Sequence, residues 1–264
     1  MGVLNVTPDS FSDGGDHAAT GAAIAAGLAL VAEGADIVDV GGESTRPGAA
    51  VVPPEMEQRR VLPVIQALAE RGVTVSVDTR NASTMAAALD AGAAIINDVS
   101  GLTHDPRARG LVATRGCPVV LMHMRGTPAT MRDRAVYADV GAEVVAELAA
   151  CLAAAEQAGV RREAIALDPG IGFAKDAAQS VAALRTLPKV VALGCPVLVG
   201  VSRKSFIGSL AREADARRRL PGSLAAGLFA LSHGAAILRV HDVRETVQAV
   251  RVWAALAYTS RPNL

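Results

Sequence analysis

The sequence predicts an α/β fold, a closed (β/α)8 barrel of the TIM type that forms a single domain over residues 1–264. Short β-rich runs alternate eight times with longer Ala-rich stretches, and this repeat is typical of the barrel. A chain of 264 residues has the length at which such barrels commonly fold as one domain. No Pro/Ser-rich linker and no abrupt change of composition divides the chain. An open doubly wound sheet is the alternative fold with the same alternation.

The predicted strands are short runs that are nearly continuous in Val, Ile and Leu. Such runs are typical of strands that are covered on both faces, as in parallel sheets; half-exposed strands instead alternate apolar and polar residues. In chain order, we expect strands at residues 2–6, 35–41, 73–79, 93–99, 118–124, 164–170, 196–202 and 236–243.

The predicted helices lie between these strands and carry apolar residues three and four positions apart. We expect them at residues 18–33, 55–71, 81–91, 106–115, 139–158, 176–187, 221–233 and 243–258. Pro53 and Pro54 mark a helix start, because proline is favoured in the first turn. Several helices end at a glycine, which accepts the left-handed conformation common just past a helix end; these are Gly34, Gly72, Gly92, Gly116, Gly159 and Gly234.

The composition argues against several classes of protein. Lys and Arg total 26, as do Asp and Glu, whereas nucleic-acid and membrane-surface binding usually need a basic excess. Charge or Gly interrupts the apolar stretches before about 18 residues, so we expect no transmembrane helix. The three cysteines are far apart and form no CxxC pair, which argues against a disulfide framework and a zinc site. With no signal peptide, we expect a cytoplasmic protein without a nucleic-acid or membrane partner.

Polar residues concentrate directly after the predicted strands. The first strand leads into "NVTPDSFSDGG", which is much longer than an ordinary turn. The other strands lead into "GGESTRPG" (41–48), "DTR" (78–80), "NDVSG" (97–101), "MHMRG" (122–126), "DPGIGF" (168–173), "SRKS" (202–205) and "RVHD" (239–242). The residues that enter the strands are plain by comparison. Because the carboxyl ends of parallel barrel strands lie on one rim, we expect these side chains to meet in one active-site mouth.

One group of these residues suits a flat nitrogen heterocycle: Asp78, Asn97, Asp168 and Lys204. A carboxylate can accept two parallel N–H bonds from an amidine-like ring edge, and Lys can donate to a ring carbonyl or nitrogen. Each acid also has a purely structural alternative. Asp78 could cap the helix at 81–91, and Asp168, which precedes Pro-Gly, could simply form a turn.

A second group is cationic and suits a phosphate or diphosphate: Arg46, Arg203, Lys204, Arg239 and His241. Arg239 and His241 alternate along the last strand, so their side chains share a face. The sequence contains no P-loop and no HExxH motif, which argues against a nucleotide loop and a zinc cage. Mg2+ fits better, because it prefers phosphate and water oxygens with one or two protein oxygens, here from Asn5 or Asp9.

The motifs "GVLNVTPDSFSDGG", "GGESTRPG", "SVDT", "INDVSG", "DPGIGF", "VSRKSFIG" and "RVHDV" resemble, over the whole chain and in order, the dihydropteroate synthase family of pterin-binding barrels. The resemblance implies a folate-pathway transferase inhibited by sulfonamides. Such an enzyme condenses 6-hydroxymethyl-7,8-dihydropterin diphosphate with p-aminobenzoate, with Mg2+, and releases dihydropteroate and diphosphate. It also implies a homodimer formed through the later helices.

The resemblance assigns residues to three subsites. The pterin pocket comprises Asp78, Asn97, Asp168 and Lys204, with Asp168 on the 2-amino and N3 edge and Lys204 on the carbonyl side. The diphosphate site comprises Asn5, Arg239 and His241, with Asn5 also on Mg2+. The p-aminobenzoate site comprises Thr45, Arg46, Pro47, Phe173, Ser202 and Lys204. The residues expected to act in catalysis are Asp78, Asp168, Lys204 and Arg239.

The expected chemistry is dissociative, because p-aminobenzoate is a weak nucleophile and the site offers no evident base for it. Diphosphate would leave first, and the two acids would stabilise the resulting CH2 cation. Direct displacement is the competing route. One departure from the family is Ala174, where the resemblance leads us to expect Gly. The alternatives to a synthase are a pterin-binding methyl-transfer module, a silent paralogue that only binds, and a generic phosphate-sugar barrel enzyme.

Overall fold

The structure is a computed structural model, and it describes residues 1–7, 15–44, 48–49 and 51–257. Four residues named above, Asp9, Thr45, Arg46 and Pro47, lie outside the described residues. Within the described part, no helix is long and apolar enough to cross a membrane.

Eight parallel strands form the centre of the molecule. They are β1 (Gly2–Asn5), β2 (Val38–Gly41), β3 (Val75–Asp78), β4 (Ile95–Asp98), β5 (Val119–Met122), β6 (Ile165–Asp168), β7 (Leu198–Val199) and β8 (Ile237–Leu238). Strands β1 to β6 pair in sequence order, and β7 pairs with β8. Parallel bridges between Leu167 and Val197 and between Gly2 and Val240 join the two sheets at both seams. The sheet is therefore closed, which confirms the barrel and rules out the open doubly wound alternative.

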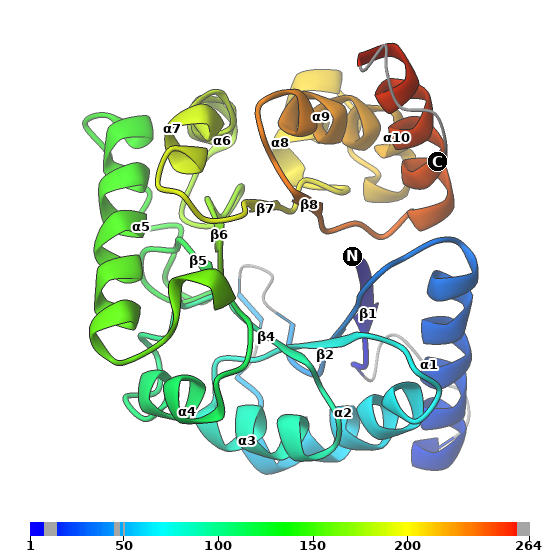
Figure 1. Ribbon diagram of the computed structural model, residues 1–264. Coiled ribbons are helices and arrows are strands. Elements are labelled where there is room, and N and C mark those ends of the chain that lie inside the picture. Colours follow the sequence, from blue (N-terminus) through cyan, green and yellow to red (C-terminus); the bar gives the residue numbers. More distant parts are fainter. Residues whose placement is uncertain (8–14, 45–47, 50, 258–264) are drawn as a thin grey trace.

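The helices surround the strands on the outside, as Figure 1 shows. They are α1 (Gly15–Ala32), α2 (Pro54–Ala69), α3 (Ala82–Asp90), α4 (Ala108–Arg115), α5 (Val140–Gln157), α6 (Ala177–Arg185), α7 (Leu187–Val191), α8 (Ser205–Ala211), α9 (Leu220–Ser232) and α10 (Val243–Ala257), with short 3-10 turns η2 (Arg162–Ala164) and η3 (Ala216–Arg218). All eight predicted helices are present. The short helices α7 and α8 were not predicted, because one or two turns are too short to show a helical period.

Local backbone rules explain where several helices begin and end. Helix α2 begins at Pro54, one residue before the predicted start at residue 55, and Asp176 caps α6 by accepting a hydrogen bond from the amide of Gln179. The six glycines predicted at helix ends all have positive φ; at the end of α4, Gly116 has φ 61° and ψ 20°. The prediction that glycine permits the left-handed turn there is confirmed.

Strand alternation sorts the core into two layers. Val119 and Leu121 of β5 belong to the large cluster between strands and helices, whereas Val120 packs in a small cluster with Met1 and Leu198. Because neighbouring side chains on a strand point to opposite faces, this small cluster lies inside the barrel. Its remaining members lie in three other strands or, for Ile37, directly before β2: Ile37, Ile95, Ala166 and Ile237. These apolar side chains fill the barrel interior toward the amino ends of the strands.

The next inward-facing residues along the same strands are polar. Two positions beyond Ile37, Ile95, Ala166 and Ile237 stand Asp39, Asn97, Asp168 and Arg239. The hydrogen-bond register also places Asn5 opposite Gly41, Gly41 opposite Asp78, and Asp78 opposite Asn97. A polar layer therefore rests on the apolar filling, at the carboxyl ends of the strands.

The segments that follow β5 and β6 approach each other closely at His123 and Gly170, and this contact gives a stability prediction. At Gly170, with φ +63°, a Cβ would lie 1.9 Å from the carbonyl oxygen of His123, whereas at Gly72, with φ +76°, a Cβ would meet nothing within 4 Å. Gly72→Ala should cost only the left-handed strain, about 1–2 kcal/mol. Gly170→Ala must also displace the backbone, and we expect a loss of about 4 kcal/mol or more in urea unfolding. Equal losses would contradict this close approach.

Candidate active site

Arg239, which follows β8, is the centre of the polar layer. Its Nε donates to Oδ2 of Asp39 at 2.6 Å, and its Nη2 donates to Oδ2 of Asp78 at 2.8 Å. The amide Nδ2 of Asn97 donates to the same Asp39 oxygen at 3.0 Å. One guanidinium thus joins β8 to β2 and β3 across the barrel, and the predicted residues Asp78, Asn97 and Arg239 meet as expected.

Asp39 is a site residue that the sequence reasoning missed. It is completely buried, and its Oδ1 has no hydrogen-bond partner among the described residues. The signal was present, because a carboxylate inside the otherwise apolar run "ADIVDVG" is costly to bury and requires a buried partner. Our inventory counted only residues after strand ends and so passed over Asp39.

Burial perturbs both members of the Arg239–Asp78 pair. Burial and, to a lesser extent, the negative charges of the neighbouring Asp39 and Glu57 raise the pKa of Asp78 to about 7. The positive charge of Arg239 opposes this shift. Burial alone would lower the pKa of Arg239, but the carboxylates of Asp39 and Asp78 more than offset it and keep the guanidinium charged. The arrangement is two carboxylates around one permanent cation. Asp78 does not act as the helix cap considered above, since α3 is preceded by Asn81, and the amide of Ala82 donates to Asp105.

Asp168, at the end of β6, and Lys204, in the segment after β7, interact as opposite charges. Burial raises the pKa of Asp168, and Lys204 is the largest opposing influence. Burial lowers the pKa of Lys204 to about 8, and Asp168 opposes that shift in turn. One carboxylate oxygen of Asp168 also accepts from the amide of Gly170 at 2.7 Å, so the turn alternative is confirmed for that oxygen.

Lys204 also meets the loop that follows β6. Its Nζ donates to the carbonyl of Ile171 and lies 4.7 Å from the centre of the Phe173 ring. A Cβ placed on Gly200 would lie 3.9 Å from Lys204 Nζ and 3.8 Å from Arg239 Cβ, so both cations flank the end of β7. Asp168, Phe173, Lys204 and Arg239 therefore occupy one mouth.

Ser202 and His241, which follow β7 and β8, contact each other beside the polar layer. The Ser202 hydroxyl lies 3.0 Å from Nδ1 of His241 and accepts from the His241 amide at 3.2 Å. Arg203, which we had grouped with the phosphate-binding cations, is tied to Asp242, with Nε donating to Oδ2 at 3.0 Å. Of the predicted cations among the described residues, Arg239 and Lys204 thus interact with the acids of the polar layer, whereas Arg203 interacts with Asp242.

The second strand exit is anchored by a buried ion pair that the sequence reasoning also missed. Arg80 donates to both carboxylate oxygens of Glu43, at 3.0 and 3.1 Å, and their side chains are only 6% and 8% exposed. The amide of Val52 donates to the same carboxylate at 3.1 Å. Glu43 therefore ties the exit of β2 to Arg80 after β3 and to Val52 before α2.

The described residues contain no group of three or more His, Cys, Asp or Glu side chains arranged to hold a metal ion. An oxygen ligand for a metal is available from the side-chain amide of Asn5. Asn5 lies opposite Gly41, and Gly41 lies opposite Asp78 of the polar layer. Mg2+ commonly takes one or two protein oxygens and completes its shell with phosphate oxygens and water. The residues present fit an Mg2+ ion that enters with a diphosphate.

The fold and this site identify the class of the protein. A family description of pterin-binding enzymes matches residues 1–241, and the chain belongs to that family. A dihydropteroate synthase of Escherichia coli is 47% identical over 253 residues, which cover 96% of this chain and 89% of that protein. A probable bifunctional folylpolyglutamate synthase/dihydropteroate synthase of Haloferax volcanii is 48% identical over 252 residues, but the chain spans only 30% of that longer protein.

Solved structures agree. A dihydropteroate synthase of Xanthomonas albilineans with 4-aminobenzoic acid superposes with a TM-score of 0.92 at 49% identity, covering 99% of this chain and 93% of that one. The same synthase is also known in complex with 7,8-dihydropteroate, with a TM-score of 0.89 and 46% identity. Within the pterin-binding enzymes, the chain groups with the dihydropteroate synthases, transferases of folate biosynthesis that condense a pterin with p-aminobenzoate to dihydropteroate. The three alternatives to a synthase are thereby set aside.

The buried pair predicts a pH-dependent loss of stability in Arg239→Met. This change leaves Asp39 and Asp78 buried without a cation, and we expect a loss of about 3–5 kcal/mol at pH 8. At pH 5.5 the loss should be smaller, because the pKa of Asp78 is already raised to about 7 and the protonated acid needs no guanidinium. Chemical unfolding at the two pH values measures this difference.

The matched control is Arg115→Met, which breaks an exposed pair with Asp90 whose side chains are 34% and 69% exposed. It should cost less than about 1 kcal/mol and change little with pH. A loss in Arg239→Met as small as the control's would show that Arg239 does not hold the two carboxylates.

Proposed function

We propose that this chain makes dihydropteroate by a dissociative alkyl transfer in the mouth formed by the strand ends. The observation that carries the proposal is the polar layer, in which Asp78 and Asp168 flank the cations Lys204 and Arg239. This set provides two anions for a nitrogen heterocycle and two cations for a carbonyl and a diphosphate. We further propose that residues 1–264 act as one catalytic domain.

The pterin lies in the inner part of the mouth, between β3, β4, β6 and β7. Asp168 accepts the 2-amino and N3 N–H groups of the ring edge with its two carboxylate oxygens, one of which also accepts from the Gly170 amide. Lys204 donates to the carbonyl side. Asp78 and Asn97, which are neighbours in register, line the opposite side of the ring. The X. albilineans complex with 7,8-dihydropteroate supports a pterin ligand for this family.

The diphosphate lies toward β8 and β1, near Arg239, His241 and Asn5. Arg239 uses Nε and Nη2 for its carboxylates, and we assign Nη1 to the diphosphate. Asn5 supplies the protein oxygen for Mg2+, which when bound neutralises charge on the leaving diphosphate. His241, oriented by the Ser202 hydroxyl, donates to the outer oxygens.

The p-aminobenzoate lies at the outer edge of the pterin, against Phe173, Ser202 and the cation Lys204. The ring of Phe173 with Lys204 4.7 Å from its centre gives the apolar and cationic surfaces that an aromatic carboxylate requires. Thr45, Arg46 and Pro47 are proposed to complete this subsite. The X. albilineans complex with 4-aminobenzoic acid supports it.

In the chemical step the C–O bond to diphosphate breaks before the new C–N bond forms. The bonding electrons leave with the diphosphate, and the reduced pterin carries the resulting CH2 cation. The carboxylates of Asp78 and Asp168 stabilise this cation because they lie in a dry, buried layer where charge interactions are strong. The amine of p-aminobenzoate then attacks the carbon and afterwards loses a proton to solvent.

We also propose that the protein is a cytoplasmic homodimer. Exposed apolar side chains on the last two long helices support a subunit contact there, namely Phe229 of α9 and Val252 and Leu256 of α10. The three cysteines, Cys117, Cys151 and Cys195, are free thiols, which supports a reducing compartment.

The pterin assignment predicts that Asp168→Asn weakens binding of the pterin by more than tenfold, about 1.4 kcal/mol, because an amide cannot accept two parallel N–H bonds. Isothermal titration calorimetry with the free pterin measures the effect. Asp176→Asn, which alters an exposed helix cap eight residues further along, is the control and should bind normally. Unchanged affinity in Asp168→Asn would mean that the pterin binds elsewhere.

The dissociative route predicts positional isotope exchange in the pterin diphosphate. With Mg2+ and without p-aminobenzoate, the bridging oxygen label should scramble into the nonbridging positions, because the C–O bond breaks reversibly. Addition of p-aminobenzoate should convert the same sample to dihydropteroate, which controls for active enzyme. Product formation with no exchange under saturating conditions would favour direct displacement.

A further inference from the structure

Lys175 is a buried ammonium that neither the sequence inventory nor the reaction above employs. It stands between the β6 exit and α6, and the residue is only 7% exposed. The chain has just three lysines against 23 arginines, and two of them lie beside the mouth: Lys175, which is buried, and Lys204, which is partly buried. Burial lowers the pKa of Lys175 to about 7, with Asp168 as the largest opposing influence. An apolar side chain would fill the space without that cost, so the ammonium needs an explanation.

The surroundings of Lys175 match the three donors of an ammonium. Nζ lies 2.8 Å from Nδ1 of His123 and donates to the carbonyls of Gly170 and Phe173, both at 3.0 Å. Two of these acceptors are carbonyl oxygens, which cannot donate. With an ammonium in place, Nδ1 of His123 must be the third acceptor, so all three protons of Lys175 are used.

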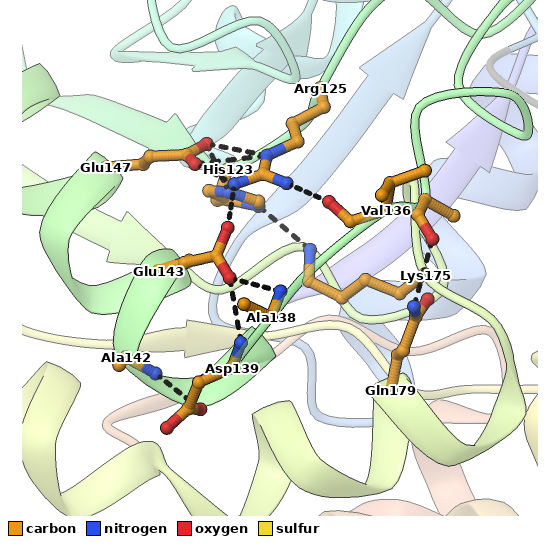
Figure 2. A network of polar contacts seen from close by, with 11 residues as sticks. His123, Arg125, Val136, Ala138, Asp139, Ala142, Glu143, Glu147, Lys175 and Gln179 are labelled. Carbon is orange, nitrogen blue, oxygen red and sulfur yellow. Dashed lines mark hydrogen bonds and ion pairs between the residues drawn. The ribbon is translucent and has the colours of Figure 1, made fainter.

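His123 is held in the tautomer that Lys175 requires. Its Nε2 lies 2.9 Å from a carboxylate oxygen of Glu147 and so carries the ring proton. Burial and the neighbouring ammonium lower the pKa of His123 to about 4, which keeps the ring neutral. Arg125 donates to the other oxygen of Glu147 at 3.0 Å. Figure 2 shows this sequence of contacts running from Arg125 through Glu147 and His123 to Lys175.

The segment that Lys175 holds carries two proposed substrate contacts, Asp168 at its start and Phe173 near its end. Ala174 has φ +47°, a left-handed conformation that is unfavourable by about 1–2 kcal/mol for a residue with a Cβ. The resemblance led us to expect Gly here, and the structure explains that expectation. A strained turn persists only where its surroundings fix it. The hydrogen bonds from Lys175 to the carbonyls of Gly170 and Phe173 fix the turn that contains Ala174.

We propose that Lys175 is a positioning residue that fixes the Phe173 ring against p-aminobenzoate, oriented by the neutral imidazole of His123. The proposal rests on the assignment of Phe173 to p-aminobenzoate made above. Asp168 is held independently, since it belongs to β6 and accepts from the Gly170 amide. Phe173 is held by its amide contact to the Gly170 carbonyl and by Lys175. Loss of the ammonium therefore releases Phe173, which we assign to p-aminobenzoate, more than Asp168, which we assign to the pterin.

The test is Lys175→Met, which keeps the length of the side chain and removes its donors. In steady-state kinetics we expect KM for p-aminobenzoate to rise about tenfold or more. Calorimetry should find the affinity for free pterin changed by less than about threefold, since the Asp168 contact is retained. The control is Lys189→Met, which alters the exposed lysine of α7 and should leave both values unchanged.

A second variant covers the case in which Lys175→Met does not fold. His123→Leu retains the lysine but removes its orienting acceptor, and KM for p-aminobenzoate should rise in the same direction. Where both single variants fold, the double variant should be no worse than Lys175→Met alone, because the two residues act as one unit. Lys175→Arg, which retains a cation and donors, should recover part of the loss.

Two results separate failure of this inference from failure of the site assignment. If Phe173→Ala raises KM for p-aminobenzoate but Lys175→Met and His123→Leu lower only the turnover number in proportion to folded protein, Lys175 is merely structural and the proposal is overturned. If Phe173→Ala itself leaves KM unchanged, the p-aminobenzoate assignment is wrong, and the proposal that depends on it is overturned as well.

Discussion

The mouth of this barrel depends on one interaction, the guanidinium of Arg239 between the carboxylates of Asp39 and Asp78. These three charges come from the eighth, second and third strands, and none is stable in the interior without the others. The strands β7 and β8 are only two residues long, and backbone hydrogen bonds continue past them, from the Arg239 amide to Val199 and from the Val240 amide to Met1, both at 3.0 Å. The ion pairs add to these bonds by tying the end of β8 to β2 and β3, and at the same time they set the charge of the substrate site.

Most of the fold was predictable because each of its eight units repeats the same physical pattern. Runs of β-branched residues between amphipathic stretches located every strand and every long helix, and glycine located six helix ends. The strands proved shorter than predicted: residues 196–202 were expected as a strand, but only Leu198–Val199 pair regularly. A continuous apolar run shows where the chain is buried, and it does not show where the hydrogen-bonded ladder begins and ends.

The site was predictable to the extent that its residues follow strands. Asp78, Asn97, Asp168, Lys204 and Arg239 were all predicted in this way, and the structure brings their side chains together at the carboxyl ends of the strands. Asp39 was missed because it lies within a strand, although period-two alternation points it inward together with Asn97 and Arg239. Lys175 and His123 were missed for a different reason. His123 was predicted only as part of the strand-exit motif "MHMRG", whereas its Nδ1 accepts a hydrogen bond from a lysine 52 positions away. Such pairings depend on tertiary geometry that local patterns do not contain.

The parallel bridge between Gly2 and Val240 gives the closed sheet a consequence for its biosynthesis. During translation β1 leaves the ribosome long before its final neighbour, so its free edge must wait until Val240 has emerged. Exposed strand edges in nascent chains invite pairing with other chains. Closure of the barrel thus waits for β1 to pair with the segment at Val240, and a premature stop before residue 240 would release a barrel that cannot close.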